Sequence, residues 1–283
     1  MRTANSLNAI TPRGWWAGFS NLFQATNASW WHTKKWLVQM VLWLLLLNGM
    51  LAGVLWSTPA GTAALSADAL VSFNSAKALQ ENPITMAFMD FMIFSALALP
   101  IAAIIAGQDA IIRERKSGTA AWILSKPVSR TAFILAKMAA NGIGSMVIGV
   151  VVQFALAYLQ LSLRTGFAWP VAGFLGMTVL AFLNMLFYLT LTYMLGTFFT
   201  NTGPVLGISL AVSLLGPSML RGLPIIRDLT PWTFFIPIVD EMTSGLSLAF
   251  GQPVESVLPI IGTAVMSLVF IAITILRFRK EEF

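Results

Sequence analysis

Cysteine is missing from this sequence of 283 residues, and histidine occurs once, as His32. Disulfides, thiol catalysis and thiolate metal sites are therefore excluded, and neither a histidine-rich metal site nor a histidine-based triad can be assembled from this chain. The phosphate-binding pattern G-x-x-x-x-G-K-S/T is absent as well, so any ATP-driven reaction must use a second chain. An intramembrane enzyme is disfavoured, because no predicted span contains a histidine or two acidic residues.

Charge is also scarce. Charged residues make up 10% of the chain, whereas soluble domains carry about 25%. Hydrophobic residues make up 57%, and the mean hydropathy is +0.80. A chain with so little charge cannot cover a water-facing surface, so much of its surface must face lipid. The formal net charge of +6 is best explained by topology, because cytoplasmic loops of membrane proteins collect Lys and Arg; it does not indicate nucleic acid.

The apolar segments predict an all-α polytopic membrane protein with six transmembrane helices in a single domain, residues 1–283. The predicted spans are residues 36–56, 86–107, 131–161, 171–199, 204–220 and 257–276, each near or above the roughly 20 residues that a bilayer needs. Pro217 is expected to kink or end the short fifth span. Prolines interrupt residues 221–253, which predicts re-entrant or interfacial helices there, and residues 63–80 are expected to contain a short outer helix.

Two features predict how the chain sits in the membrane. The aromatic and apolar residues Trp15, Trp16, Phe19, Leu22 and Phe23 fall at helical spacing, which is typical of a helix lying in the membrane interface; the alternative is a helix packed on a soluble core. With the N-terminus in the cytoplasm, 13 of the 17 basic residues lie on the inner side. The positive-inside rule therefore predicts that both termini are cytoplasmic.

The loop between the second and third predicted spans contains a series of helix signals. Gly118 is expected to end the helix that leaves the second span, where Arg113 can pair with Asp109 at i,i+4. Thr119 is expected to cap a new short helix over residues 120–125, which the following Pro127 closes. Ser129 is then a plausible N-cap for the third span.

Three large apolar residues, Trp122, Ile123 and Leu124, lie on this short helix. A cytoplasmic loop has no reason to expose such side chains to water unless they lie on the membrane or enter the groove of a partner.

The pattern Glu114-Arg115-x-x-Gly118-Thr119, followed by Leu124-Ser125-x-Pro127-Val128-Ser129-Arg130 and Lys137, resembles the signature of permease subunits of ABC-2 type transporters. The resemblance extends over the whole chain and is closest to six-span bacterial and archaeal permeases whose ATPase is a separate polypeptide. It implies a type V exporter-like fold in which residues 119–127 form a coupling helix that seats in a cleft of the ATPase. The alternative is that the basic residues are a positive-inside cluster and Trp122 is an interface anchor.

The resemblance implies a permease subunit of an ATP-driven exporter in the prokaryotic cell membrane, and not an enzyme. Its expected partners are two ATPase subunits, which would bring ATP and Mg²⁺, a second copy or a related permease, and lipid; nucleic acid is not expected, nor a cofactor bound by this chain. The predicted coupling residues are Arg113, Glu114, Gly118, Thr119, Trp122, Ile123, Leu124 and Pro127. The alternative function is a non-transporting membrane scaffold or accessory subunit that docks a cytoplasmic partner.

Polar and small residues within spans are further candidates, because polar groups are costly in lipid. The candidates for a substrate path are Gln153 and Gln160 on the third span and Asn184 and Tyr188 on the fourth. The favoured alternative for all four is hydrogen bonding between helices of one subunit. On the fifth span, Gly203, Gly207 and Ala211 form a row of small residues that permits close helix packing at a dimer interface.

Overall fold

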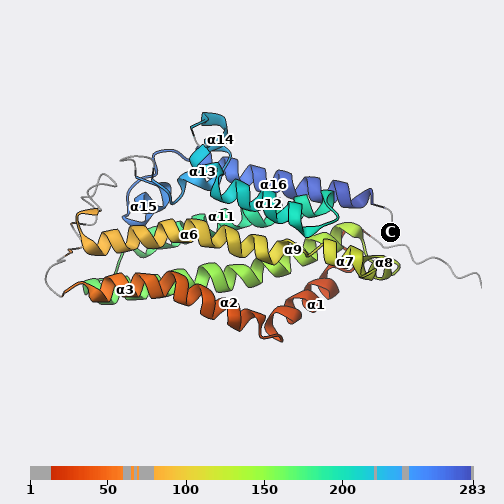
Figure 1. The fold of residues 1–283 in the computed structure, drawn as a ribbon, viewed down its shortest axis with the longest axis horizontal. Coiled ribbons are helices and arrows are strands. Elements are labelled where there is room, and N and C mark those ends of the chain that lie inside the picture. The colour runs from red at the N-terminus through yellow and green to blue at the C-terminus, as the bar shows by residue number, and fades with distance from the viewer. Residues whose placement is uncertain are drawn as a thin grey trace, which may run out of the picture.

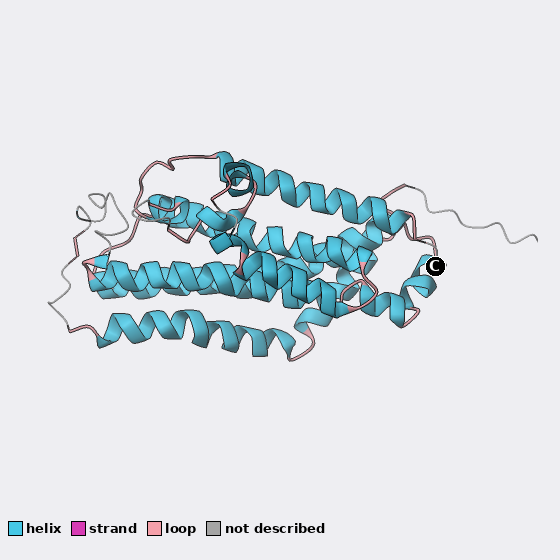
Figure 2. Cartoon of the chain, turned by 45° about the horizontal axis from the view of Figure 1, so that its top comes forward, coloured by secondary structure: helices cyan, strands magenta, loops and turns pink. Residues whose placement is uncertain are grey.

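The computed structural model describes residues 14–59, 65–66, 69, 80–219, 222–237 and 242–281. Within that part of the chain every regular element is a helix, and Figure 2 shows helices joined by loops with no strand among the residues drawn in colour. The long helices run side by side along one elongated bundle, with α7, α8 and the C-terminal end gathered at one end and α15 at the other (Figure 1). The predicted all-α class is therefore confirmed.

Five helical segments are long and apolar enough to cross a bilayer. They are Trp36–Ser57, Pro83–Lys116, Arg130–Thr165, Val171–Phe198 and Leu258–Arg279, and each coincides with a predicted span. The second and third are longer than the roughly 20 residues a bilayer needs. Their surplus extends toward the end of the bundle that holds α7 and α8 (Figure 1).

The predicted fifth span corresponds to a shorter helix. Here α12, Thr202–Leu214, has 13 residues, or about 20 Å at 1.5 Å per residue, compared with a hydrocarbon core of about 30 Å. The four-residue helix α13, Gly216–Met219, follows it and contains Pro217. The helix thus ends just before the proline, as predicted, and a sixth span remains a prediction.

Two of the spans contain a π-helical segment. Span 1 comprises α2 (Lys35–Trp43), the π-helix η1 (Leu44–Asn48) and α3 (Gly49–Ser57). Span 3 comprises α9 (Arg130–Met146), the π-helix η2 (Val147–Val151) and α10 (Val152–Thr165). Such single π-turns are rare and often occur at functional sites.

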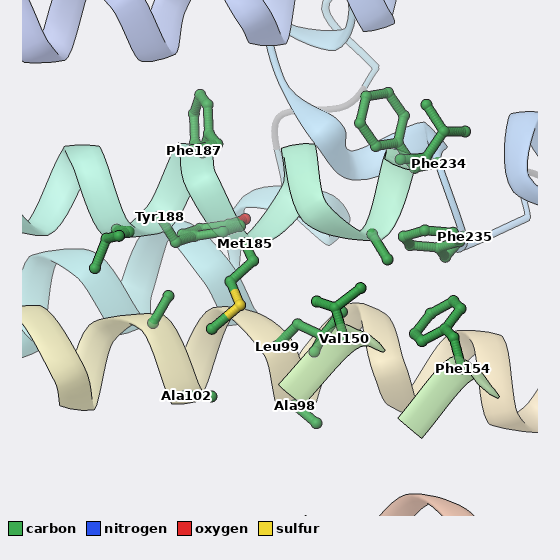
Figure 3. Packing of buried hydrophobic residues seen from close by; sticks show 14 of the residues in the cluster. Ala98, Leu99, Ala102, Val150, Phe154, Met185, Phe187, Tyr188, Phe234 and Phe235 are labelled. Atoms are coloured by element: carbon green, nitrogen blue, oxygen red, sulfur yellow. The ribbon is translucent and has the colours of Figure 1, made fainter. Parts of the chain in front are cut away.

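The core is built around α11, Val171–Phe198, which packs against α6 (Pro83–Gly107) and α16 (Leu258–Arg279). Met185 of α11 is directed toward Leu99 and Ala102 of α6 (Figure 3). All three side chains are at most 4% exposed, so the centre of the bundle is closely packed rather than an open channel.

Short helices cover one end of the bundle. They are α14 (Pro224–Asp228), the 3-10 helix η3 (Pro231–Thr233) and α15 (Ser244–Ala249), in agreement with the predicted breaks at the prolines. Gly173 lets α15 approach α11, since a Cβ atom on Gly173 would lie 1.9 Å from the carbonyl oxygen of Leu248. The predicted outer helix within residues 63–80 falls largely outside the described residues.

The first helix, α1, runs over Phe19–Trp31 and packs along α9. It begins later than the aromatic pattern predicts, since Trp15 and Trp16 lie in the turn before it and are 58% and 49% exposed. A Cβ atom on Gly144 of α9 would lie 2.7 Å from the ring of Trp30. The absence of a side chain on Gly144 therefore allows α1 to dock on span 3.

Candidate coupling site

The predicted coupling loop begins with a helical stem at the end of span 2. The stem is α7, Ile112–Lys116, and Ile111 and Ile112 anchor it with side chains that are 2% exposed. Arg113 forms the predicted i,i+4 salt bridge with Asp109. The Arg113 side chain is 67% exposed, so this pair contributes little to stability.

Gly118 separates the stem from the short helix, as the sequence predicts. Its φ angle of 70° lies in the left-handed region, which costs glycine far less than other residues. The short helix is α8, Thr119–Leu124. The predicted cap at Thr119 is wrong: Gly118 occupies the N-cap position, and the Thr119 hydroxyl lies 2.7 Å from the Ser117 hydroxyl instead.

The three apolar residues of α8 do not share one environment. Trp122 is 62% exposed, and the Nζ atom of Lys126 lies 3.7 Å from the centroid of its ring. Ile123 and Leu124 are half-buried and pack against the hydrophobic core, and Ala120 is 1% exposed. One face of α8 is thus seated on the bundle, while the indole of Trp122 is left facing outward.

The returning limb of the loop leads into α9. Beyond Pro127, Ser129 is the N-cap of this helix, and its side chain accepts a hydrogen bond of 3.0 Å from the backbone N–H of Ala132. The predicted N-cap is therefore confirmed. The Ser129 hydroxyl also contacts the carbonyl oxygen of Trp15, and a cavity of about 620 Å³ lies beside it against Leu124 and Arg279.

Glu114 ties the stem to span 3. Its Oε1 atom lies 2.7 Å from Nζ of Lys137, and the two side chains are 20% and 14% exposed. The other carboxylate oxygen, Oε2, is buried and has no hydrogen-bond partner in the described structure. Glu114, one of the predicted coupling residues, is thus engaged with α9, and its role in coupling remains a prediction.

Arg115 ties the stem to two further helices. Its Nη1 and Nη2 atoms donate hydrogen bonds of 3.2 and 2.9 Å to the carbonyl oxygens of Phe199 and Gly196, at the end of α11. Nη2 also lies 2.8 Å from Oε1 of Glu281, just beyond α16. Sequence reasoning missed Glu281; the signal that could have found it is an acidic residue directly after the basic cluster of Arg277, Arg279 and Lys280.

The polar candidates on span 3 belong to a buried amide cluster. Asn48 of η1 donates a hydrogen bond of 2.6 Å to the side-chain oxygen of Gln153 and accepts one of 2.9 Å from Gln160. Gln153 also donates to the carbonyl oxygen of Ile148 within η2, at 3.1 Å. The cluster joins spans 1 and 3 beside their π-turns. Sequence reasoning missed Asn48, although an amide inside an apolar span is a visible signal.

The candidates on span 4 lie apart from that cluster. Tyr188 accepts a hydrogen bond of 2.9 Å from the indole N–H of Trp232, and Asn184 is 3% exposed. The hydrogen bonds of Gln153, Gln160 and Tyr188 support the packing alternative for these three residues. The substrate path predicted for the four residues remains a prediction.

The small residues of α12 face away from the bundle. Gly203, Gly207 and Ala211 are exposed, and a Cβ atom on either glycine would meet nothing within 4 Å. The opposite face packs inward through Val205 and Ser209, which are both 0% exposed. The row is thus exposed on the outside of the bundle, and the dimer packing predicted for it remains a prediction.

A comparison with protein families identifies a match over most of the chain. A family model described as "ABC-2 family transporter protein" matches residues 32–283. The match includes all five membrane-spanning candidates, α12 and the predicted coupling loop. No curated protein matches the chain.

Proposed function

Because the chain belongs to the ABC-2 transporter family and is a multi-pass membrane protein, we propose that it is the permease subunit of an ATP-driven exporter. A separate ATPase would bind the cytoplasmic loop and hydrolyse ATP with Mg²⁺, since this chain lacks a phosphate-binding loop. Both termini lie in the cytoplasm of a prokaryotic cell in this proposal.

The observation that carries the proposal is the exposed Trp122 on a braced support. Ala120 and the half-buried Ile123 hold α8 against the bundle, whereas the Trp122 ring is 62% exposed. A large aromatic side chain on a fixed element fits the anchor that a partner's groove requires. If the basic residues served only to orient the chain in the membrane, neither the short helix α8 nor its packing against the bundle would be needed.

The contacts of the stem provide a route from the ATPase to the membrane. A push on α8 reaches α7 across Gly118, and α7 is joined to α9 by the Glu114–Lys137 pair and to the end of α11 by Arg115. Movement of the loop would therefore displace spans 2, 3 and 4 together. This linkage is the physical basis of coupling in our proposal.

The permease would act as a pair of subunits, either two copies or this chain with a related one, each with its own ATPase. The open row of Gly203, Gly207 and Ala211 on α12 offers a surface where a second permease can approach closely. The substrate would cross between the two permeases. We assign Gln153, Gln160, Asn184 and Tyr188 to packing inside one subunit.

The test is affinity purification of the chain from its native host in mild detergent. We expect an ATPase with a nucleotide-binding motif to co-purify, and reconstitution of the pair in liposomes to give hydrolysis that a transported compound stimulates. The chain alone should hydrolyse no ATP. Recovery of a cytoplasmic partner without ATPase activity would instead support the scaffold alternative.

A further inference from the structure

The two limbs of the coupling loop meet at the C-terminal end of α16. On the departing limb, Nη2 of Arg115 lies 2.8 Å from Oε1 of Glu281. On the returning limb, Nη1 of Arg130 donates a hydrogen bond of 2.7 Å to the carbonyl oxygen of Arg279 and another to the carbonyl oxygen of Glu281. Glu281 therefore contacts both limbs, one through its side chain and the other through its backbone.

The end of α16 is itself firmly placed. The ring of Phe278 is 0% exposed and stacks on Phe133 of α9, with centroids 5.5 Å apart and an interplanar angle of 4°. Arg115 is held at the same time by the carbonyl oxygens at the end of α11. The position of Glu281 is thus defined by span 3 and the last span, and it connects both to α7.

The charges around Glu281 indicate that its ion pair with Arg115 fixes the arrangement of the helix ends more than it adds to stability. Burial raises the pKa of its carboxyl group, although the neighbouring Arg115, Arg277 and Arg130 act in the opposite direction. Its Oε2 atom is buried and has no partner among the described residues. An enclosed ion pair of this kind contributes little net stability, but it favours one arrangement of the groups that it joins.

We propose that Glu281 is a positioning residue for the coupling loop, which holds the limbs of α7 and α9 together so that α8 presents Trp122 in a fixed orientation. The use of a fixed Trp122 for binding an ATPase rests on the proposed function. How rigidly α8 is held, however, can be measured on the permease without an ATPase, so the two proposals can fail separately.

The experiment is hydrogen exchange, followed by mass spectrometry, on the full chain in lipid nanodiscs. The amides of Trp122, Ser125 and Lys126 report on α8, because each donates a backbone hydrogen bond of 3.0 to 3.1 Å. In Glu281→Ala we expect these amides to exchange about tenfold faster, the factor expected for loss of one hydrogen bond to a charged group. Glu281→Gln retains an acceptor for Arg115 and should remain close to wild type.

Glu255→Ala is the matched control, since Glu255 is an exposed carboxylate remote from the loop in sequence, and it should leave the exchange of α8 unchanged. Unchanged exchange of α8 in Glu281→Ala would overturn the proposal. So would equal acceleration throughout the bundle, or a Glu281→Gln variant as fast as Glu281→Ala. If the wild-type chain binds no ATPase, the proposed function fails, while the exchange result still decides the role of Glu281.

Discussion

The Nζ atom of Lys137 on span 3 lies 2.7 Å from Oε1 of Glu114 on the stem of the predicted coupling loop, and water reaches little of either side chain. The nearby Asp109–Arg113 pair joins residues four apart and is far more exposed. The adjacent residues Arg113 and Glu114 thus form two salt bridges of different character: the Glu114 pair crosses between helices, and the Arg113 pair lies along the surface.

The first prediction uses this contrast. Lys137→Ala should lower the free energy of unfolding by about 1.5–3 kcal/mol, because it leaves the enclosed carboxylate of Glu114 without its partner. Arg113→Ala should cost no more than about 0.5 kcal/mol, as is usual for an exposed i,i+4 pair. Denaturant unfolding in detergent micelles measures both values. Equal losses would show that the Glu114–Lys137 pair does not brace the stem.

The second prediction concerns Trp122. Trp122→Ala should weaken binding of the ATPase by about 2 kcal/mol or more. The permease should insert and unfold as before, because the ring is 62% exposed and its cation–π neighbour, Lys126, belongs to the same loop. Binding is measured by titrating the purified ATPase onto permease in nanodiscs. The matched control is Trp56→Ala, which removes an indole that is 58% exposed at the end of span 1. If Trp122→Ala bound the ATPase with wild-type affinity and kept hydrolysis coupled to transport, the loop would only orient the chain in the membrane.

A third prediction tests the row of small residues on α12. A Cβ atom on Gly207 would meet nothing within 4 Å, so we expect Gly207→Leu to leave the stability of the monomer nearly unchanged, but overpacking at a dimer contact should cost about 1–3 kcal/mol of association. The oligomeric state is measured by mass photometry over a range of concentrations. Ala272→Leu, at an exposed position on α16, is the control. The same monomer fraction in both variants would exclude this face from the interface.

The fourth prediction separates packing from transport in the amide cluster. Asn48→Leu should lower stability by about 1–2 kcal/mol, because Gln153 and Gln160 lose a partner inside the bilayer. Gln160→Leu added to Asn48→Leu should cost less than it does alone, since the two changes remove the same hydrogen bond. Unfolding of the four proteins in a double-mutant cycle gives the coupling. A variant with unchanged stability but altered transport would support a substrate path instead.

The fifth prediction addresses orientation, and the lack of native cysteine makes the measurement clean. Ser117→Cys lies in the coupling loop and Ser256→Cys in the segment before the last span, and both positions are exposed. In intact cells, a membrane-impermeant thiol reagent should label Ser256→Cys and spare Ser117→Cys. After lysis both should react. Labelling of Ser117→Cys in intact cells would reverse the topology.

Local chemistry made much of the coupling loop predictable. Gly118 breaks the stem and Ser129 caps α9 because each effect depends on the backbone within a few residues. The cap predicted at Thr119 is wrong for the same reason: Gly118 and Thr119 are both acceptable at that position, and the left-handed turn at Gly118 decides between them. The choice depends on how the loop is seated, which local preference does not specify.

The sequence by itself determined the membrane class, the positions of the five long spans, and the predicted coupling loop between the second and third spans. Hydropathy and helix signals suffice for these features because they depend on about 20 neighbouring residues or fewer. Only the tertiary structure decided which polar groups meet. Asn48 and Gln153 are 105 residues apart, and Arg115 lies at the end of the second span whereas Glu281 follows the last one. Such pairs depend on how the packed helices are rotated and placed against one another, and no local pattern contains that information.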